Sequence, residues 1–490
     1  MKKKWPEIVL SSGDNRISQA IRRAVKSHEL RKIAPKIYTS NFIDSPEQVL
    51  KKNRYQLLGL LFPNAVISHR SALEGGFSDG NIVLNYKYSK VIQFPGLTIR
   101  LVQGHGPDEE DSPFLENLYI ASRGRAFLEN LTRSRARRGY SKNVSQYDLE
   151  ERLDRMIRVY GIEELNLLRD QARRVSLRLK MKEAFYRLDR MIGALLGTRE
   201  AGSLTSARAL SRAKGEPYDP NRIELFATLA AYLQQQELSQ IPSTVQTKSS
   251  LIHQAFFESY FSNYIEGTEF AIEEAEKIIF ENKIFPNRKE DSHDILSTFE
   301  MVSDRHLMQT VPKNESELIV LLQQRHARLM DGREETLPGR FKDKMNRAGN
   351  TVFVKPDEVK GTLSKGFSIY KQLKPGVSRA LFMMFLVSEI HPFVDGNGRI
   401  ARIMMNAEFD IANECRIIIP TVYREDYLLA LRRLSRQQDP SPYVRMMLKA
   451  QAFTHSIPFE DYNQALIRLR AANAFMEPNE AKLIFHSNQA

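Results

Sequence analysis

The sequence predicts a mainly α-helical protein preceded by a smaller α+β region. Two observations support this fold class. From residue 217 onward, apolar residues recur at spacings of three and four, the period of a helix with one buried face. Within residues 75–105, short β-branched runs such as Ile82-Val83-Leu84 alternate with glycine-containing turns, as strands do. Residues 113–197 return to a helical, arginine-rich pattern.

The chain is long enough for two or three domains, since it has 490 residues of which 42% are hydrophobic. Glycines and prolines gather between residues 201 and 221, which we take as a linker. We therefore predict a basic domain at 1–105, a helical arginine-rich region with the linker at 106–216, and a helical domain at 217–490 with its core at 250–450.

Cysteine content and apolar runs limit the class of protein. The single cysteine, Cys415, excludes intramolecular disulfides and cysteine-based zinc clusters, and its apolar neighbours predict an inert buried thiol. The longest dense apolar run, Leu381 to Val387, is far short of the ~18 residues that span a bilayer. Pro6 and Glu7 interrupt the basic start before any signal-peptide core forms. We expect a cytoplasmic protein without membrane association; the sequence does not reveal its oligomeric state.

Charge is distributed unevenly along the chain. Residues 1–216 hold 39 Lys and Arg against 24 Asp and Glu, an excess of 15, whereas residues 217–490 hold 33 against 35. The basic part is the candidate for binding nucleic acid or an acidic partner. A solvated basic surface without a specific partner is the alternative, and the Arg133–Arg138 cluster is equally explained as an exposed helix end.

The first basic segments read as a helix followed by a hairpin. Asn15–Val25 places apolar residues on one face and arginines on the other, and Arg31–Thr39 alternates basic and apolar residues around Pro35. This order resembles the end of a winged helix, and residues 1–100 are similar to the winged-helix antitoxins of abortive-infection systems. The resemblance implies DNA contact, mostly to phosphates, which positions a protein without reading sequence. The implied contacts are Arg16, Arg22, Arg23, Arg31, Lys32 and Lys36.

The stretch from His391 to Arg402 carries the strongest chemical signal. A buried helix is predicted to end before His391, because Pro392 disfavours a helical residue ahead of it. Two glycines then precede a second helical run, so free N–H groups and the positive end of a helix dipole meet at this loop. Arg399 and Arg402, three apart on that helix, can reach one anion. The stretch therefore predicts a phosphate site.

The same stretch resembles the Fic signature, H-P-F-x-[DE]-G-N-G-R-x-x-R, with every fixed position filled. Capping and pairing in a plain helix–loop–helix is the structural alternative. The resemblance implies a helical Fic domain that binds ATP with Mg²⁺. In it His391 would be the general base, Asp395 the Mg²⁺ ligand, and Arg402 the partner of the γ-phosphate. The groups implied to cradle the α- and β-phosphates are Gly396, Asn397, Gly398 and Arg399.

Two further segments resemble parts of the same family. Ser262 to Gly267 matches the inhibitory motif [ST]-x-x-x-E-[GN], in which Glu266 would pair with Arg402 and exclude the γ-phosphate; an ordinary exposed glutamate is the alternative. Asn346 to Pro356 resembles the flap, a β-hairpin that holds the target segment by strand addition. The implied pairing strand comprises Thr351, Val352, Phe353 and Val354. Lys342 stands where the family often has arginine.

The function that this resemblance implies is transfer of AMP from ATP to a Ser, Thr or Tyr hydroxyl of a target protein, with autoinhibition by Glu266. Two alternatives stay open. The domain could remove AMP from a modified protein, with Glu266 positioning water. It could instead sense a nucleotide within a DNA-binding regulator or antitoxin-like protein. Phosphotransfer of the kind found in Doc toxins is disfavoured, because it goes with a loop lacking these glycines.

Overall fold

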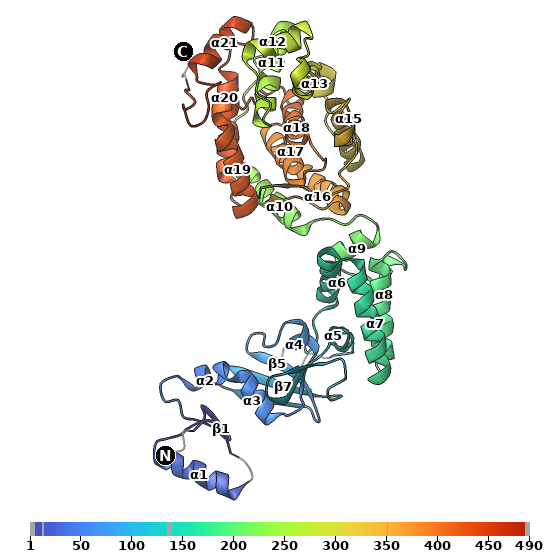
Figure 1. Cartoon of the computed structure of the whole chain (residues 1–490), viewed down its shortest axis with the longest axis vertical. Coiled ribbons are helices and arrows are strands. Elements are labelled where there is room, and N and C mark those ends of the chain that lie inside the picture. The colour runs from blue at the N-terminus through green and yellow to red at the C-terminus, as the bar shows by residue number, and fades with distance from the viewer. Residues whose placement is uncertain (1–4, 12–13, 135–139, 350, 486–490) are drawn as a thin grey trace. The chain divides into compact units, whose positions relative to one another are not determined.

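The computed structural model describes residues 5–11, 14–134, 140–349 and 351–485. The chain divides into two compact units, residues 1–215 and 216–490. Helices make up most of the second unit, and the strands lie almost entirely in the first (Figure 1). This confirms the predicted fold class, a mainly helical protein with an α+β N-terminal part.

The first unit begins with a helix and a hairpin, as predicted. Helix α1 (Asn15–Lys26) starts where the Asp14 carboxylate accepts the Arg16 N–H, and it buries Ile21 and Ala24. Strands β2 (Arg31–Ala34) and β3 (Ile37–Thr39) pair antiparallel, and β1 (Ile8–Leu10) completes a sheet of order β1-β3-β2. The assignment of this part as a winged helix stays a prediction.

A second sheet follows, of order β6-β7-β5-β4-β9-β8. The strands predicted within residues 75–105 are present as β5, β6 and β7. The predicted boundary at residue 105 is wrong, because β8 and β9 beyond it belong to this sheet and β9 pairs parallel with β4. Acidic residues and very short strands hid this continuation from the sequence pattern. The strands are β4 (Val66–Ile67), β5 (Asn81–Tyr86), β6 (Lys90–Phe94), β7 (Leu97–Gln103), β8 (Ser112–Phe114) and β9 (Leu118–Ile120).

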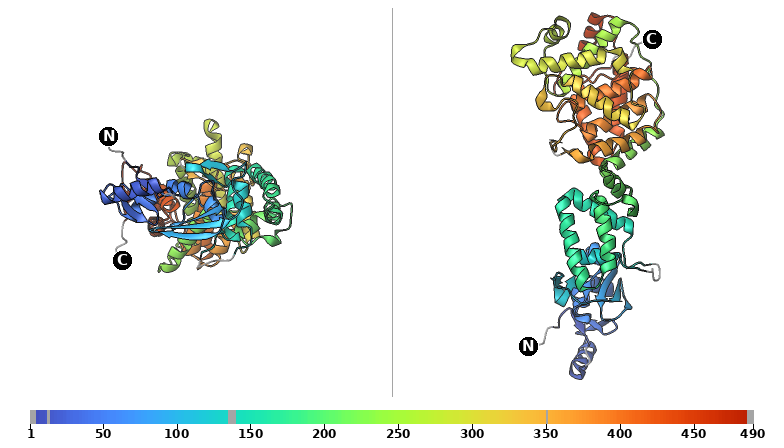
Figure 2. Two further views of the ribbon diagram at one scale, coloured as in Figure 1. Left: turned by 90° about the horizontal axis from the view of Figure 1, so that it is seen from below. Right: turned by 90° about the vertical axis from the view of Figure 1, so that its right-hand side faces the viewer.

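A helical layer completes the first unit, and α7 and α8 run side by side in it (Figures 1 and 2). Leu153, Leu165 and Leu188 are fully buried in its core. Helix α9 lies inside the predicted linker, so that linker is shorter than expected. Residues 135–138 of the arginine cluster lie outside the described residues. The helices of this unit after α1 are α2 (Pro46–Lys52), α3 (Arg54–Leu61), α4 (His69–Leu73), α5 (Arg123–Asn130), α6 (Gln146–Tyr160), α7 (Ile162–Arg178), α8 (Lys182–Leu195) and α9 (Ala207–Ala213).

The second unit is a helical assembly around α17 (Val377–Ile390), which is buried along most of its length. Helices α18 (Asn397–Ile411) and α11 (Lys248–Ile265) bring the signature and inhibitory segments to its centre (Figure 1). The hairpin of β10 (Arg347–Ala348) and β11 (Thr351–Val352) is the one sheet among the unit's described residues. The other helices are α10 (Pro220–Gln235), α12 (Ile272–Glu281), α13 (Lys289–Ser303), α14 (Arg305–Met308), α15 (Glu315–Leu329), α16 (Val359–Tyr370), α19 (Arg424–Gln437), α20 (Ser441–His455) and α21 (Tyr462–Ala471).

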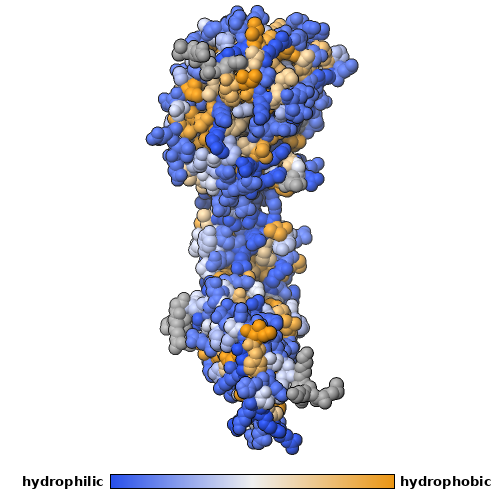
Figure 3. All heavy atoms as spheres, turned by 90° about the vertical axis from the view of Figure 1, so that its left-hand side faces the viewer, coloured by the Kyte–Doolittle hydropathy of each residue, from blue (hydrophilic) through white to orange (hydrophobic). Residues whose placement is uncertain are grey.

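The surface is mixed in character. On the face drawn in Figure 3, hydrophobic residues are scattered among hydrophilic ones. None of the helices in the described part of the chain has both the length and the apolar character that a bilayer crossing needs. Cys415 is buried, and burial raises the pKa of its thiol to about 12, as expected for an inert core cysteine.

Candidate functional site

The signature loop turns sharply between two helices. His391 ends α17 in the left-handed conformation, with φ of 55°, and Gly396 precedes α18 with φ of 71°. Asn397 fixes the bend, because its side-chain oxygen accepts the Phe393 N–H and its amide donates to the Phe393 carbonyl, both at 2.9 Å. The buried Asn397 side chain is therefore committed to the loop. Asn397 shapes the backbone of the loop, and its predicted role in cradling phosphates stays a prediction.

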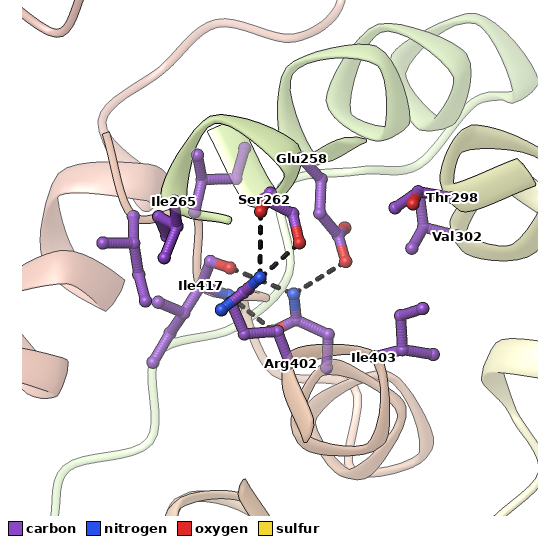
Figure 4. Close-up of a pocket in the computed structure, with 11 residues that line it drawn as sticks. Glu258, Ser262, Ile265, Thr298, Val302, Arg402, Ile403 and Ile417 are labelled. Carbon is purple, nitrogen blue, oxygen red and sulfur yellow. Dashed lines mark hydrogen bonds between the residues drawn. The ribbon is translucent and has the colours of Figure 1, made fainter. Parts of the chain in front are cut away.

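Glu266 and Arg402, predicted to pair, are in contact. Glu266 Oε1 lies 2.6 Å from Arg402 Nη2, and the same guanidinium donates to the Ser262 hydroxyl at 3.0 Å and its carbonyl at 2.9 Å. Figure 4 shows the Arg402 side chain reaching Ser262 of α11. Burial opposes ionisation of Glu266, but the nearby cations outweigh it and hold its pKa below the usual value. The carboxylate is thus ionised at neutral pH.

The Glu266 carboxylate, which follows α11, lies against the N-terminal turn of α18. A Cβ built on Gly398 would come within 2.1 Å of Glu266 Oε1, so only glycine allows this approach. The carboxylate therefore lies where the first turn of the helix offers its N–H groups and partial positive charge. An anion already sits in the place predicted for a phosphate, and it comes from the chain itself.

Arg399 is held by a carboxylate that the sequence analysis missed. Asp294 of α13 lies 2.5 Å from Arg399 Nη1 and 3.0 Å from Arg333 Nη1, and all three side chains are largely buried. Burial raises the pKa of Asp294, but His293 and the two arginines outweigh it and lower the pKa overall. No motif surrounds Asp294 in the sequence, so only the fold could reveal it. It orients Arg399 and offsets the charge of both guanidinium groups.

Asp395 has the setting of a metal ligand. Its side chain is half-exposed, and its nearest cations, Arg399 and Arg333, are 3.8 and 3.9 Å away, beyond hydrogen-bonding range. Among the described residues no group of three His, Cys, Asp or Glu could hold a metal. Mg²⁺ at nucleotide sites is commonly bound by one or two carboxylates and substrate phosphates. The half-exposed Asp395 carboxylate, beside a site for phosphates, fits that donor set.

His391 is a neutral base with its tautomer fixed. Its Nδ1 lies 3.2 Å from the Ser388 carbonyl, which can only accept, so Nδ1 carries the proton and Nε2 keeps a lone pair. The ring stacks on Phe353 at 3.8 Å and 6°. Burial lowers the pKa of His391 to about 4, well below its ordinary value of 6.5.

The flap is shorter than predicted. Of the four residues taken as its pairing strand, only Thr351 and Val352 form β11. Phe353 turns inward onto the His391 ring, and Val354 is fully buried in the core. Lys342, also buried, donates to the Asn346 side chain at 2.6 Å, and burial lowers its pKa to about 7.

His326 is a second positioning residue absent from the sequence analysis. The Gly339 N–H donates to Nδ1 at 2.9 Å, which leaves Nε2 to donate to the Asp395 carbonyl at 3.1 Å. The ring also stacks on Phe393 at 3.8 Å. Burial lowers the pKa of His326 to about 4, so the neutral ring ties α15 to the signature loop across physiological pH.

These groups border an open cleft of about 400 Å³. Its lining includes His391, Glu266, Gly398 and Arg402 together with residues of the flap. Helix α19 forms a further wall with residues that the sequence analysis did not single out. The lining residues of that helix are Tyr427, Leu428, Leu431, Arg432, Ser435 and Arg436. An ionised carboxylate, a neutral imidazole and the oriented Arg402 guanidinium therefore share one cleft.

Comparisons with known proteins agree with the signature. Residues 319–408 match the Fic/DOC family model. The protein adenylyltransferase Fic of Drosophila persimilis is 25% identical over 216 residues, covering 42% of this chain and 42% of that protein. The same-named protein of Nematostella vectensis is 24% identical over 220 residues, covering 44% and 51%. The chain thus spans about half or less of the length of these relatives.

Solved structures give a weaker similarity. Fic-1 from C. elegans matches with a TM-score of 0.37 and 15% identity, covering 67% of this chain and 98% of that one. A TM-score of this size does not establish a common fold over the whole chain. The similarity to the Fic/DOC family depends instead on the signature and on the family model. Within its second unit, this chain is similar to the Fic/DOC family over residues 319–408.

Proposed function

We propose that the second unit is a protein adenylyltransferase that moves AMP from ATP to a Ser, Thr or Tyr hydroxyl of a target protein. The observation that carries this proposal is the Glu266 carboxylate bound to Arg402 at the start of α18, beside a neutral imidazole. A site that accepts one anion in this position can accept a phosphate instead. The curated relatives named protein adenylyltransferase Fic support the same activity.

The residues of the cleft divide the chemistry between them. His391 Nε2 takes the proton of the acceptor hydroxyl, whose oxygen attacks the α-phosphorus. A new P–O bond forms as the bond between the α-phosphorus and the bridging oxygen breaks, and pyrophosphate leaves. Arg399 and the N–H groups around Gly396 and Gly398 stabilise the charge on the α- and β-phosphates. Bound Mg²⁺, held by Asp395, would supply further charge neutralisation at the phosphates.

Arg402 links catalysis to inhibition. It would bind the γ-phosphate, but in this structure Glu266 holds it. ATP in a productive position therefore competes with a carboxylate that is already hydrogen-bonded there. Ser262 keeps the guanidinium in place through two hydrogen bonds, so release of Glu266 leaves Arg402 oriented for the phosphate. Autoinhibition is the consequence.

Labelled ATP tests this function. We would incubate the protein with ATP labelled at the α-phosphate and Mg²⁺, as wild type and as Glu266→Gly, His391→Ala and the double variant. Transfer onto the protein or onto lysate proteins should rise with the first change and vanish with the second. Silence in all four would favour the alternative in which the domain only senses nucleotide. Release of AMP from a previously modified target, dependent on Glu266, would favour removal of AMP.

We also propose that the basic face of the first unit binds DNA. Arg16, Arg22 and Arg23 on α1 and Lys32 and Lys36 on the hairpin are exposed. Arg31 is not among the available contacts, since its guanidinium donates to the Asn41 and Asp44 carbonyls. Sequence-independent phosphate contacts suit such side chains.

Gel retardation over a salt series tests DNA binding. If all five cations contact phosphates, the logarithm of the binding constant should fall against that of the salt concentration with a slope of up to about −4.5. Replacing Arg22 and Arg23 by Gln should reduce the slope by about 2, whereas Lys180 and Lys182, exposed elsewhere on the unit, serve as the matched control. If the Arg22/Arg23 variant and the Lys180/Lys182 variant gave the same salt dependence, DNA binding by the α1 and hairpin face would be excluded.

A further inference from the structure

The outer edge of the flap is already occupied. The Phe353 N–H donates across the hairpin to the Asn346 carbonyl at 3.3 Å, and the next pair is Val352 with Arg347. Because hydrogen-bonded and non-hydrogen-bonded pairs alternate in an antiparallel ladder, Val352 directs its N–H and carbonyl away from β10. Arg222 Nη2 of α10 donates to that carbonyl at 2.8 Å. An added strand would need the same group.

A buried glutamate holds the Arg222 side chain in place. Its Nε lies 2.9 Å from Glu389 Oε1, and Glu389 also accepts the Ser435 hydroxyl at 2.9 Å. The Glu389 side chain is only 6% exposed, so this partner lies inside the protein, and its burial raises the pKa of the carboxyl. The charge of Arg222 is therefore balanced within the protein, while its Nη2 holds the flap edge.

Helix α19 presents positive charge beside the same edge. Arg432 and Arg436, one helical turn apart, both line the cleft and are exposed. Arg436 donates to the Thr351 hydroxyl at 2.9 Å. Within the described part of the chain neither forms an ion pair. Both carboxylates that line the cleft, Glu266 and Glu389, are already paired with other arginines. The wall next to the flap therefore has an excess of positive charge.

We propose that the target segment is an extended peptide with an acidic side chain close to its acceptor hydroxyl. Its carboxylate pairs with Arg436 and Arg432, and its backbone takes the Val352 carbonyl from Arg222. This inference rests on the proposed transfer function and adds the substrate class. Strand addition along β11 passes the peptide over Phe353, which stacks on His391, so the acceptor hydroxyl comes next to the base.

Peptide binding and modification test the proposal in the Glu266→Gly variant. One labelled synthetic peptide has a single serine flanked by aspartates, and its partner has asparagines there. The aspartate peptide should bind and react about fivefold better, the upper end for an exposed ion pair, and salt should reduce the preference. Arg432→Gln with Arg436→Gln should abolish it. Arg433→Gln, on the same helix but lining a different groove, should keep it.

The hydrogen bond from Arg222 to the Val352 carbonyl is tested with Arg222→Lys. Lysine keeps a cation beside Glu389, but its side chain is too short to reach Val352. Both peptides should then bind more tightly by a similar factor. Equal binding of the two peptides by the Glu266→Gly variant, or a preference that survives loss of Arg432 and Arg436, would overturn the proposal. Calorimetry with Mg-ATP on each variant separates this failure from failure of the transfer function, since peptide binding is scored by fluorescence anisotropy without reaction.

Discussion

Removing the Glu266 charge should strengthen ATP binding by an amount that the structure bounds. Breaking a fully buried ion pair by removing one partner costs about 3–5 kcal/mol. Glu266 is 36% exposed, however, and solvent screening reduces its hold on Arg402 to about 1–2 kcal/mol. ATP no longer has to displace this interaction in Glu266→Gln or Glu266→Gly. Because 1.4 kcal/mol is tenfold, Mg-ATP affinity should rise about 5- to 30-fold.

Isothermal calorimetry with Mg-ATP measures this change directly. Glu269→Gln, an exposed glutamate three residues further on, is the matched control and should leave the affinity unchanged. Arg402→Gln combined with Glu266→Gly should lose the gain, because the partner of the γ-phosphate is then absent. ADP should show a much smaller gain than ATP. If Glu266→Gly bound Mg-ATP no better than wild type, the carboxylate would not be competing with a phosphate.

Three further predictions concern the surrounding groups. Asp294→Asn removes the buried carboxylate that lies nearest to both Arg399 and Arg333, so the free energy of unfolding in urea should fall by about 3 kcal/mol. The half-exposed Asp291→Asn should change it little, and equal effects would refute the role of Asp294. With the pKa of His391 at about 4, kcat/KM of Glu266→Gly should stay level from pH 8 down to about pH 5, and an acid limb near pH 6.5 would contradict the assigned neutral base. The pKa of Lys342 is about 7 when folded and 10.5 in its ordinary state, so the unfolded chain binds the extra proton between these values and stability should rise with pH across this window by about 1.4 kcal/mol per pH unit. That contribution is lost as pH falls towards 7, and Lys342→Met should remove the slope in urea titrations followed across the window.

Local chemistry explains what could be predicted from the sequence. The signature loop combines proline and glycine with flanking apolar periodicity, and each of these acts on its own neighbours in the chain. The helices ending at Ile390 and beginning at Asn397 follow from those local rules. The Glu266–Arg402 contact could be predicted only from the resemblance to a family motif, because 136 residues separate the two partners.

Long-range geometry explains the rest. Asp294, His326 and Arg222 act through contacts with residues far along the chain, and none has a neighbourhood that distinguishes it from an ordinary helical residue. The loop-closing role of Asn397 was not predicted, because a side chain that can bind phosphate can equally close its own loop, and residue type does not separate the two. The predicted domain boundary at residue 105 was misplaced because β8 and β9 have only three residues each, too few to show an alternating pattern.

The Phe353–His391 stack has a spectroscopic consequence. Protons of an imidazole lying flat over a benzene ring are shifted upfield by its ring current, and the shift vanishes once the rings part. The His391 resonances would therefore report how often the hairpin lifts, with no label added. The chemical shifts of the proposed base, His391, would thus also report whether the cleft is open.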